Sequence, residues 1–507
     1  MRRLARDVLL MILATGISRV FGLGREVAVA DRFGLTAAYD AFLIAFFLPH
    51  TLRQLFAEGA LSVAFVPLYA EQRTSSEKDA HRFACNVISW LTLALPIVAG
   101  LGVLAAPLLV RVLAIGFSAE KLNLTVFIAR IVFPFIILVG LSAVLMGILQ
   151  AHRRFFAASL APVWSNIGMI LGAVVLAAAF PANPIMGLAV GLLVGGAGQI
   201  LGQLPSLRAI GFRFRFVLFP VHPKVWCLLR RMAPAVLALA VTQINLLVDN
   251  QLASFLEDGG ISALQYGMRL FQLPIGVLGV SVATALLPRF ATAHATGDDA
   301  AFSDYFGSGL VASLFLLLPA MAGLLVVGPD LVRLLFEHGQ FQAIDTARTT
   351  HVLMAYLVGL VPYGLVYVQT RASYALGRSG IPLIASTCAV AANVVLDLLL
   401  VGALQETGLA LATAVAGVVN AAVLAFLLRR TVRLSRRRWR EVGRTILGTL
   451  LVAAGALGSR WSVASLGHPA VSVVVPVVVG CAVYTAYAWW TGLWAGVGLG
   501  PRDVTPS

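Results

Sequence analysis

The sequence predicts an all-α polytopic membrane protein with about fourteen transmembrane helices. Hydrophobic residues make up 60% of the 507 residues, charged residues make up only 12%, and the mean hydropathy is +0.92. A soluble domain carries about 25% charged residues. Apolar runs of about 20 residues, the length that crosses a bilayer as a helix, recur from one end of the chain to the other. The first run continues past Arg19 and Arg25, so we expect a retained helix rather than a cleaved signal peptide.

Each candidate span is an apolar run bounded by charged, proline-containing or glycine-containing segments. The second span is long and contains Pro49 and Gly59, so it is expected to be kinked or broken. The fourteen spans are expected at about residues 8–31, 38–70, 83–110, 122–149, 156–180, 185–207, 232–256, 262–288, 302–327, 347–371, 381–402, 406–428, 443–459 and 470–494.

Charge in the connecting segments predicts the orientation. Lys and Arg collect strongly in every second connection, beginning with the N-terminus, which places both termini in the cytoplasm. The net charge of +15 then reflects loops that face anionic lipid rather than nucleic acid. The loops are too short for a soluble catalytic domain, and no P-loop, GxSxG, HExxH or paired CxxC motif occurs, so no enzyme activity is expected.

A weak internal repeat predicts the domain organisation. The second span ends in AFVPLYAE at 64–71 and the eighth in ALLPRFAT at 285–292, an offset of six spans. An even offset indicates two parallel six-helix lobes, an arrangement in which transporters place a substrate site near the bilayer midplane. We expect an N-lobe over 1–215, a C-lobe over 216–430 and a C-terminal helix pair over 431–507.

Arginines inside three apolar spans form the main candidate site. A charge at the bilayer centre costs roughly 2.5–3.5 kcal/mol on insertion scales, so these arginines need a cavity, a partner or an anionic ligand. A guanidinium stays charged and can grip phosphate with two hydrogen bonds, which suits a pyrophosphate. The alternative is internal ion pairing with Asp40, Glu58 or Glu26. The candidate substrate-binding residues are Arg19, Arg25, Arg53 and Arg269, together with Ser18 beside Arg19.

Two acidic residues and a histidine accompany the arginines. Asp40 and Glu58 bracket the Arg53 segment and are candidates for a gate, the alternative being local helix pairing or capping. His50 is a candidate cavity residue.

Oxygen-bearing side chains in later spans form a candidate cation site. Asn393 and Asp397 are four residues apart in the eleventh span and share a helix face, while Asp249 lies in the seventh span and Thr413 in the twelfth. Such ligands suit Na⁺ or a proton. Hydrogen bonding between helices is the alternative, and no other cofactor is expected.

Three segments resemble the MurJ (MviN) lipid II flippase family of the multidrug/oligosaccharidyl-lipid/polysaccharide exporter superfamily. They are SRVFGLGREVAVADRFG (18–34), DAFLIAFFLPHTLRQLFAEGALSVAFVPLYAE (40–71) and YGMRLFQLPIGVLGVSVATALLPRF (266–290). The resemblance covers essentially the whole chain. It implies a V-shaped, two-lobe transporter that moves the undecaprenyl-pyrophosphate-linked peptidoglycan precursor lipid II to the outer leaflet by alternating access.

The resemblance also implies roles for the candidate residues. The four arginines would face the pyrophosphate, and Asp40 and Glu58 would occupy the acidic gate and cavity positions. Asp249, Asn393, Asp397 and Thr413 would match a sodium site, and the last two spans would form a groove for the lipid tail. The partners implied are lipid II and membrane lipids, with the protein acting as a monomer.

Other functions explain the sequence less well. A relative that flips another polyprenyl-linked glycan would need the same arginines, whereas a drug exporter would not. A membrane glycosyltransferase would need an acidic catalytic residue on a sizeable outer loop, and a scaffold would leave the arginines unexplained.

Overall fold

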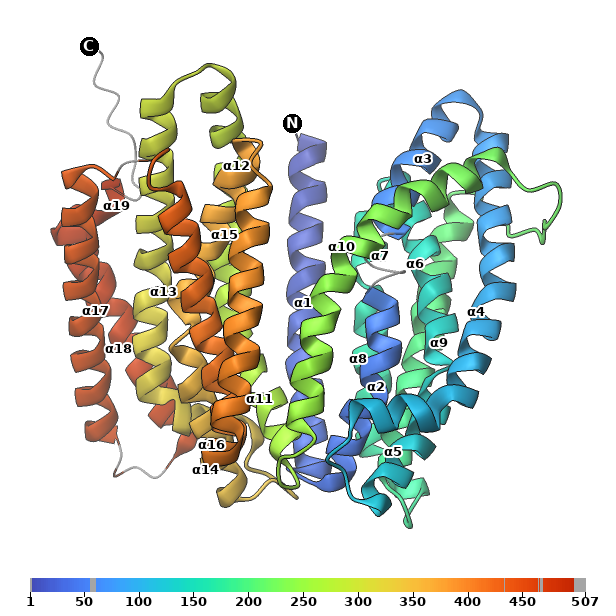
Figure 1. The fold of residues 1–507 in the computed structure, drawn as a ribbon, viewed down its shortest axis with the longest axis horizontal. Coiled ribbons are helices and arrows are strands. Elements are labelled where there is room, and N and C mark those ends of the chain that lie inside the picture. The colour runs from blue at the N-terminus through green and yellow to red at the C-terminus, as the bar shows by residue number, and fades with distance from the viewer. Residues whose placement is uncertain (1, 55–60, 433, 464, 466–467, 497–507) are drawn as a thin grey trace. The chain divides into compact units, whose positions relative to one another are not determined.

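The computed structural model describes residues 2–54, 61–432, 434–463, 465 and 468–496. In these residues the regular structure is helical and contains no strand (Figure 1). The helices pack into two compact units, of which the first comprises 1–262 with 338–341 and the second comprises 263–337 with 342–507. The three-domain division expected from the sequence repeat stays a prediction.

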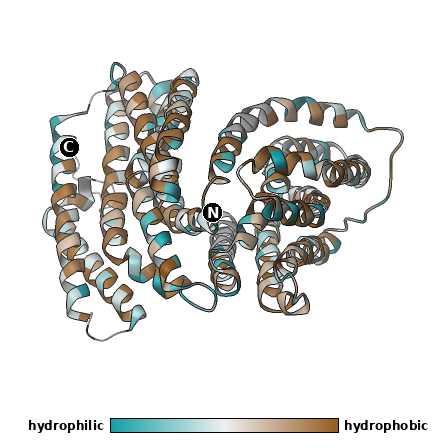
Figure 2. Cartoon of the chain, turned by 60° about the horizontal axis from the view of Figure 1, so that its bottom comes forward, coloured by the Kyte–Doolittle hydropathy of each residue, from teal (hydrophilic) through white to brown (hydrophobic). Residues whose placement is uncertain are grey.

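Ten helical stretches among the described residues are long and apolar enough to cross a membrane. Four more segments complete the series: α1, the α2–α3 pair, α10 and the second half of the kinked α16. Hydrophobic residues run along most of the helices (Figure 2). The expected all-α fold with about fourteen spans is therefore confirmed.

The first unit contains the helices up to α10. Their bounds are α1 (Arg2–Phe33), α2 (Ala37–Leu52), α3 (Ser62–Ser75), α4 (Glu77–Leu113), α5 (Ala119–Val132), α6 (Phe135–Ala151), α7 (Phe155–Ser159), α8 (Ala161–Val174), η2 (Leu176–Ala179), α9 (Ile185–Ala209) and α10 (Pro223–Ala253).

The remaining helices follow the same pattern of long apolar segments with short connections. They are α11 (Gly260–Pro274), η3 (Ile275–Gly279), α12 (Val280–Ala295), α13 (Asp299–Phe336), α14 (Ala343–Leu357), α15 (Leu360–Ala375), α16 (Gly380–Leu428), α17 (Arg436–Val463), α18 (Pro469–Trp490) and α19 (Leu493–Gly496). The π-helical turn η3 follows Pro274, and α16 bends at Gln405, which has φ of 50°.

Glycines hold α8 and α9 together in the first unit. A Cβ added to Gly168 would lie 2.3 Å from the Cα of Gly195, and one added to Gly191 would lie 2.4 Å from the Gly168 carbonyl oxygen. Small residues at these positions let two membrane helices pack backbone to backbone, where van der Waals contact replaces the hydrophobic effect.

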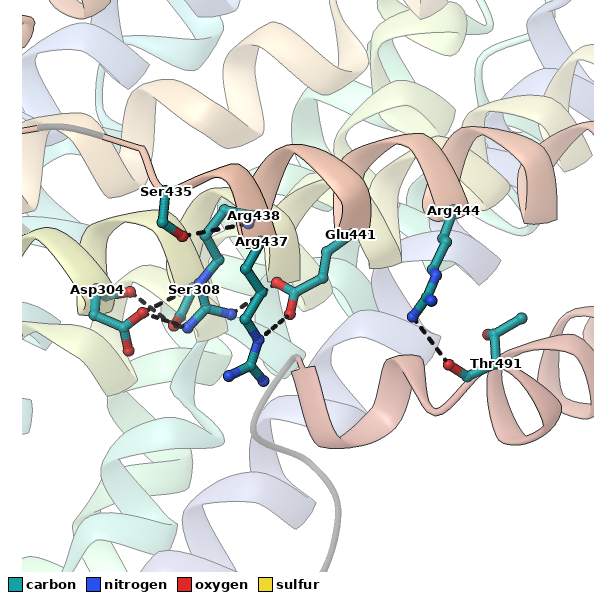
Figure 3. A network of polar contacts seen from close by, with 8 residues as sticks. All are labelled: Asp304, Ser308, Ser435, Arg437, Arg438, Glu441, Arg444 and Thr491. Atoms are coloured by element: carbon teal, nitrogen blue, oxygen red, sulfur yellow. Dashed lines mark hydrogen bonds and ion pairs between the residues drawn. The ribbon is translucent and has the colours of Figure 1, made fainter.

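An ionic network fastens α17 to α13 in the second unit (Figure 3). Arg438, which is buried, donates from Nη2 to Asp304 (2.8 Å) and to the Ser308 hydroxyl (2.5 Å), and from Nη1 to Glu441 (2.8 Å). Arg437 also donates to Glu441, at 3.1 Å. The buried Arg438 guanidinium thus finds hydrogen-bond acceptors on two helices, as a buried charge requires.

Candidate functional site

Two of the candidate arginines lie on α1 of the first unit. Arg19 is exposed, and the neighbouring Ser18 carbonyl accepts a hydrogen bond from Asn166 of α8 (3.4 Å). Arg25 is half-buried, forms an ion pair with the buried Glu26, and contacts the Met169 sulfur at 3.9 Å. The α1 helix therefore carries guanidinium groups along its apolar length, one of them already paired with a carboxylate.

The third arginine ends α2. Arg53 donates to the Nε2 of His50 at 3.1 Å, and the His50 ring packs on Phe46 with centroids 5.3 Å apart. One residue further on, the Gln54 side chain accepts a hydrogen bond from Gln243 of α10 (2.8 Å). Arg53 and His50 are thus brought together, in a polar segment that also reaches α10. The other acidic candidate, Glu58, lies outside the described residues.

Arg269 lies on α11 in the second unit, one helical turn after Gln265. With the Gln265 amide turned so that its oxygen faces the guanidinium, it accepts from Nε (3.2 Å) and Nη2 (3.0 Å) of Arg269. The π-helical turn η3 begins six residues later, at Ile275. Such turns place a local bend in a helix and occur often at functional sites.

Asp40 is the centre of a buried ionic cluster in the first unit. Its Oδ1 accepts from the backbone N–H (2.9 Å) and hydroxyl (2.6 Å) of Ser262. Its Oδ2 accepts from the Gly259 N–H (2.8 Å) and from Lys121 Nζ (2.9 Å). Lys121 in turn contacts Asp258 at 2.7 Å. The carboxylate therefore caps the start of α11, where unpaired N–H groups and the helix dipole favour negative charge.

Sequence reasoning did not single out Lys121 or Ser262 as partners of Asp40. Lys121 lies 81 residues away from Asp40, at the start of α5, and only 8% of its side chain is exposed. One signal could have found Lys121. A fully buried carboxylate needs a cation or several hydrogen-bond donors, and few lysines occur in this chain to supply the cation.

The candidate sodium ligands divide between the two units. Asp249 lies on α10 of the first unit and accepts from Asn245 at 3.2 Å. Asn393 and Asp397 share one face of α16 in the second unit, both buried, with Asn393 donating to Asp397 at 2.6 Å. Thr413 follows the α16 kink and donates to the Leu409 carbonyl at 3.0 Å.

No group of three or more His, Cys, Asp or Glu side chains suited to a metal occurs in the part of the chain that the structure describes. Oxygen ligands from amides, hydroxyls and carbonyls are what Na⁺ would need instead. The sodium site therefore stays a prediction.

The fold and these charges define a polytopic membrane transporter. Its apolar helices carry ionic side chains, and polar groups inside membrane spans are typical of transporters, which use them to bind substrates and ions.

Comparison with known proteins identifies the family. The sequence model of the family described as lipid II flippase MurJ matches residues 29–477. The chain is 37% identical over 457 residues to the probable lipid II flippase MurJ of Rhizobium tropici, covering 88% of this chain and 84% of the relative. It is 32% identical over 423 residues to the corresponding protein of Rickettsia prowazekii, covering 83% of each. The chain belongs to the MurJ family.

Solved structures agree with this assignment. A structure described as lipid II flippase MurJ in an inward closed conformation matches with a TM-score of 0.80 and 29% identity, covering 96% of this chain and 99% of that chain. An inward-facing multidrug resistance MATE family transporter of the MOP superfamily matches with a TM-score of 0.66 and 16% identity, over 85% of this chain and 98% of the other. The second likeness shows a shared fold.

Proposed function

We propose that this protein is a lipid II flippase, which moves the undecaprenyl-pyrophosphate-linked peptidoglycan precursor from the cytoplasmic to the outer leaflet of the bacterial inner membrane. The observation that carries the proposal is membership of the MurJ family over residues 29–477. The arginines in apolar helices support it, because planar guanidinium groups suit the oxygens of a pyrophosphate.

The proposed site consists of Arg19, Arg25, Arg53 and Arg269, with Ser18 and His50 beside them. Arg25 is paired with Glu26 in this structure, so substrate capture has to compete with that ion pair. If the substrate phosphate replaces Glu26 as the partner of Arg25, the guanidinium stays paired with an anion throughout. This avoids the cost of an unpaired charge in an apolar segment.

Alternating access is the proposed mechanism, and Asp40 is the proposed gate residue on the outer side. Its bonds to Lys121, Gly259 and Ser262 fasten α2 and α5 to the start of α11. We infer that these bonds hold the start of α11 in place within the first unit, and that releasing them frees the chain that leads into the second unit.

Several further features belong to the proposal. The protein acts as a monomeric transporter rather than an enzyme, with both termini in the cytoplasm. Sodium bound by Asp249, Asn393, Asp397 and Thr413 biases the cycle, since one charge moved across 100 mV is worth about 2.3 kcal/mol. The C-terminal pair α17–α18 holds the lipid tail.

Binding of purified protein to lipid II, and to the same polyprenol without pyrophosphate, tests the proposal. Arg25→Ala would remove one ion-pair contact from the buried Glu26, so it is compared with the double variant Arg25→Ala/Glu26→Gln. Arg269→Ala tests the second unit, and Arg130→Ala, an exposed arginine on α5, is the matched control.

We expect selective binding of lipid II, lost in the Arg25 and Arg269 variants and kept in the control. The rate at which lipid II crosses the membrane of liposomes containing the protein should fall in the same variants. Equal binding of both lipids, unaffected by the substitutions, would refute the pyrophosphate site. Selective transport of a different polyprenyl-pyrophosphate-linked glycan would favour the alternative flippase function.

A further inference from the structure

A sharp turn after α9 brings an arginine-rich segment back against the first unit. Gly211 has φ of 76°, its N–H bonds to the Arg208 carbonyl (3.0 Å), and the Phe212 N–H bonds to the Leu207 carbonyl (3.0 Å). This is a Schellman ending, in which glycine adopts the left-handed conformation and closes the last helical turn. The turn reverses the chain so that residues 212–214 return beside the end of α9.

Residues 212–218, which we call the strap, are fastened to α4 through their backbone. The Arg213 carbonyl accepts from His81 Nε2 at 2.8 Å. The Val217 N–H donates to the Ser89 hydroxyl (2.9 Å), and Asn86 donates to the Val217 carbonyl (2.9 Å). The backbone of the strap is therefore held in place by side chains of α4, although it contains no helix or strand.

A cavity of about 450 Å³ lies between the strap and the ends of α6 and α9. Its volume falls within the range of small-molecule sites, about 300–1,000 Å³. Apolar side chains form most of the lining, and two arginines complete it. The lining consists of Leu145, Leu204, Leu207, Phe212 and Phe214, with the arginines Arg208 and Arg213.

The guanidinium groups of the two cavity arginines are available to bind a ligand. Within the described part of the chain, neither the Arg208 nor the Arg213 guanidinium forms a hydrogen bond or ion pair. Acidic side chains on the neighbouring helices are engaged elsewhere: Asp79 contacts His222 at 3.3 Å, and Glu71 contacts Lys224 at 2.8 Å. Both cavity arginines are exposed and therefore keep their charge available to an anion.

We propose that this cavity is a binding site for an anionic phospholipid, whose phosphate contacts Arg208 and Arg213 and whose acyl portion enters the apolar lining. The site is separate from the proposed lipid II site, which uses residues of α1, α2 and α11. It therefore does not depend on the proposed transport function.

The surroundings favour a lipid over a soluble anion. Phe214, Phe216, Phe219 and Trp226 follow one another along the chain, and each has about half or more of its surface exposed. Exposed aromatic rings beside basic residues are typical of segments at the membrane interface, where anionic headgroups attract Lys and Arg. A soluble phosphate would use the two charges and leave the apolar lining empty.

Titration of the purified full chain with phosphatidylglycerol, followed by native mass spectrometry, tests the site. Phosphatidylcholine with the same acyl chains is the neutral comparison. The test variant Arg208→Gln/Arg213→Gln removes both charges from the cavity. The matched control, Arg215→Gln/Arg231→Gln, removes two exposed arginines of the same region that do not line it.

A third variant, Leu204→Trp, fills the cavity and keeps both arginines. We expect phosphatidylglycerol affinity to fall about tenfold for each cavity guanidinium removed, because hydrogen bonds to charged groups are the strong ones. Leu204→Trp should weaken binding several-fold, and the control less than twofold. Thermal unfolding of each variant without added lipid verifies folding, and if Leu204→Trp does not fold the arginine variants decide.

Two results would overturn the assignment. Equal loss in the test and control variants would mean that diffuse charge, rather than the cavity, attracts the lipid. Glycerol phosphate competing as well as the intact phospholipid would mean that the apolar lining makes no contribution, and the site would then be one for a soluble phosphate. Preference for phosphatidylglycerol over phosphatidylcholine that disappears only in the cavity variants supports it.

Discussion

Neutralising Asp40 should destabilise the protein more than any exposed charge change. In Asp40→Asn, one side-chain oxygen becomes an NH₂ group that faces donors, because the Gly259 N–H and the Lys121 ammonium both bond to Oδ2. Breaking one side of a buried pair costs about 3–5 kcal/mol. Lys121 keeps its contact with Asp258, whose side chain is 68% exposed, so we expect the lower end of that range, about 3 kcal/mol.

Unfolding by added dodecyl sulfate in mixed micelles, followed by circular dichroism, measures this loss. Glu257→Gln, an exposed change in the same loop as Asp258, is the control and should stay within about 0.5 kcal/mol of the parent. A double-mutant cycle with Lys121→Met should give a coupling of at least about 1 kcal/mol with Asp40→Asn. Additive effects, or an Asp40→Asn curve that overlays the control, would refute the buried-pair reasoning.

Three other changes test packing, backbone strain and titration. Gly168→Ala should destabilise by about 2 kcal/mol, because its Cβ would lie 2.3 Å from Gly195, whereas Gly100→Ala, with open space around it, should not; the same unfolding assay compares them. Gln405→Gly should stabilise by about 1 kcal/mol, because the combination of φ 50° and ψ −133° is open to glycine and strained for a residue with a Cβ; an unchanged or lower unfolding midpoint would contradict this. Burial, with a smaller effect of a nearby positive charge, lowers the pKa of His152, so its neutral form is favoured on folding. Its contribution should be present above pH about 6.5 and lost as the pH falls, and the stability–pH curve of His152→Gln should be flatter between pH 7 and 5.

Helix positions were predictable because hydropathy reports the bilayer directly. The break near residues 403–405 was expected from the sequence and is found at Gln405. Helix ends were less predictable, since the last apolar residue marks the membrane boundary and not the helix boundary. The seventh span was expected from about residue 232, whereas α10 begins at Pro223, where proline occupies the first helical turn and His222 caps it.

Bonds between distant charges could not be derived from the pattern. A carboxylate in an apolar segment indicates that bonding partners are needed, but tertiary packing decides which residues those partners are. Asp40 bonds to Lys121 and Ser262, which lie 81 and 222 residues away. The strap at 212–218 is neither helix nor strand, because its backbone bonds to side chains of α4. Its sequence therefore shows no helical or strand periodicity of apolar residues that could have predicted it.

Burial separates two kinds of charge in this chain. Asp40, Lys121 and Arg438 are each less than 9% exposed and bonded to groups on other helices, so they hold helices together. Arg25 keeps 18% of its side chain exposed and Arg19 is exposed on the same helix. A residue that holds helices together can be replaced, with its partner, by an apolar pair of similar shape at little cost in stability. Arg19 and Arg25, in the role proposed for them, could not be replaced in this way, because a phosphate needs the charge of the guanidinium itself. Paired substitutions at the two kinds of position would measure this difference.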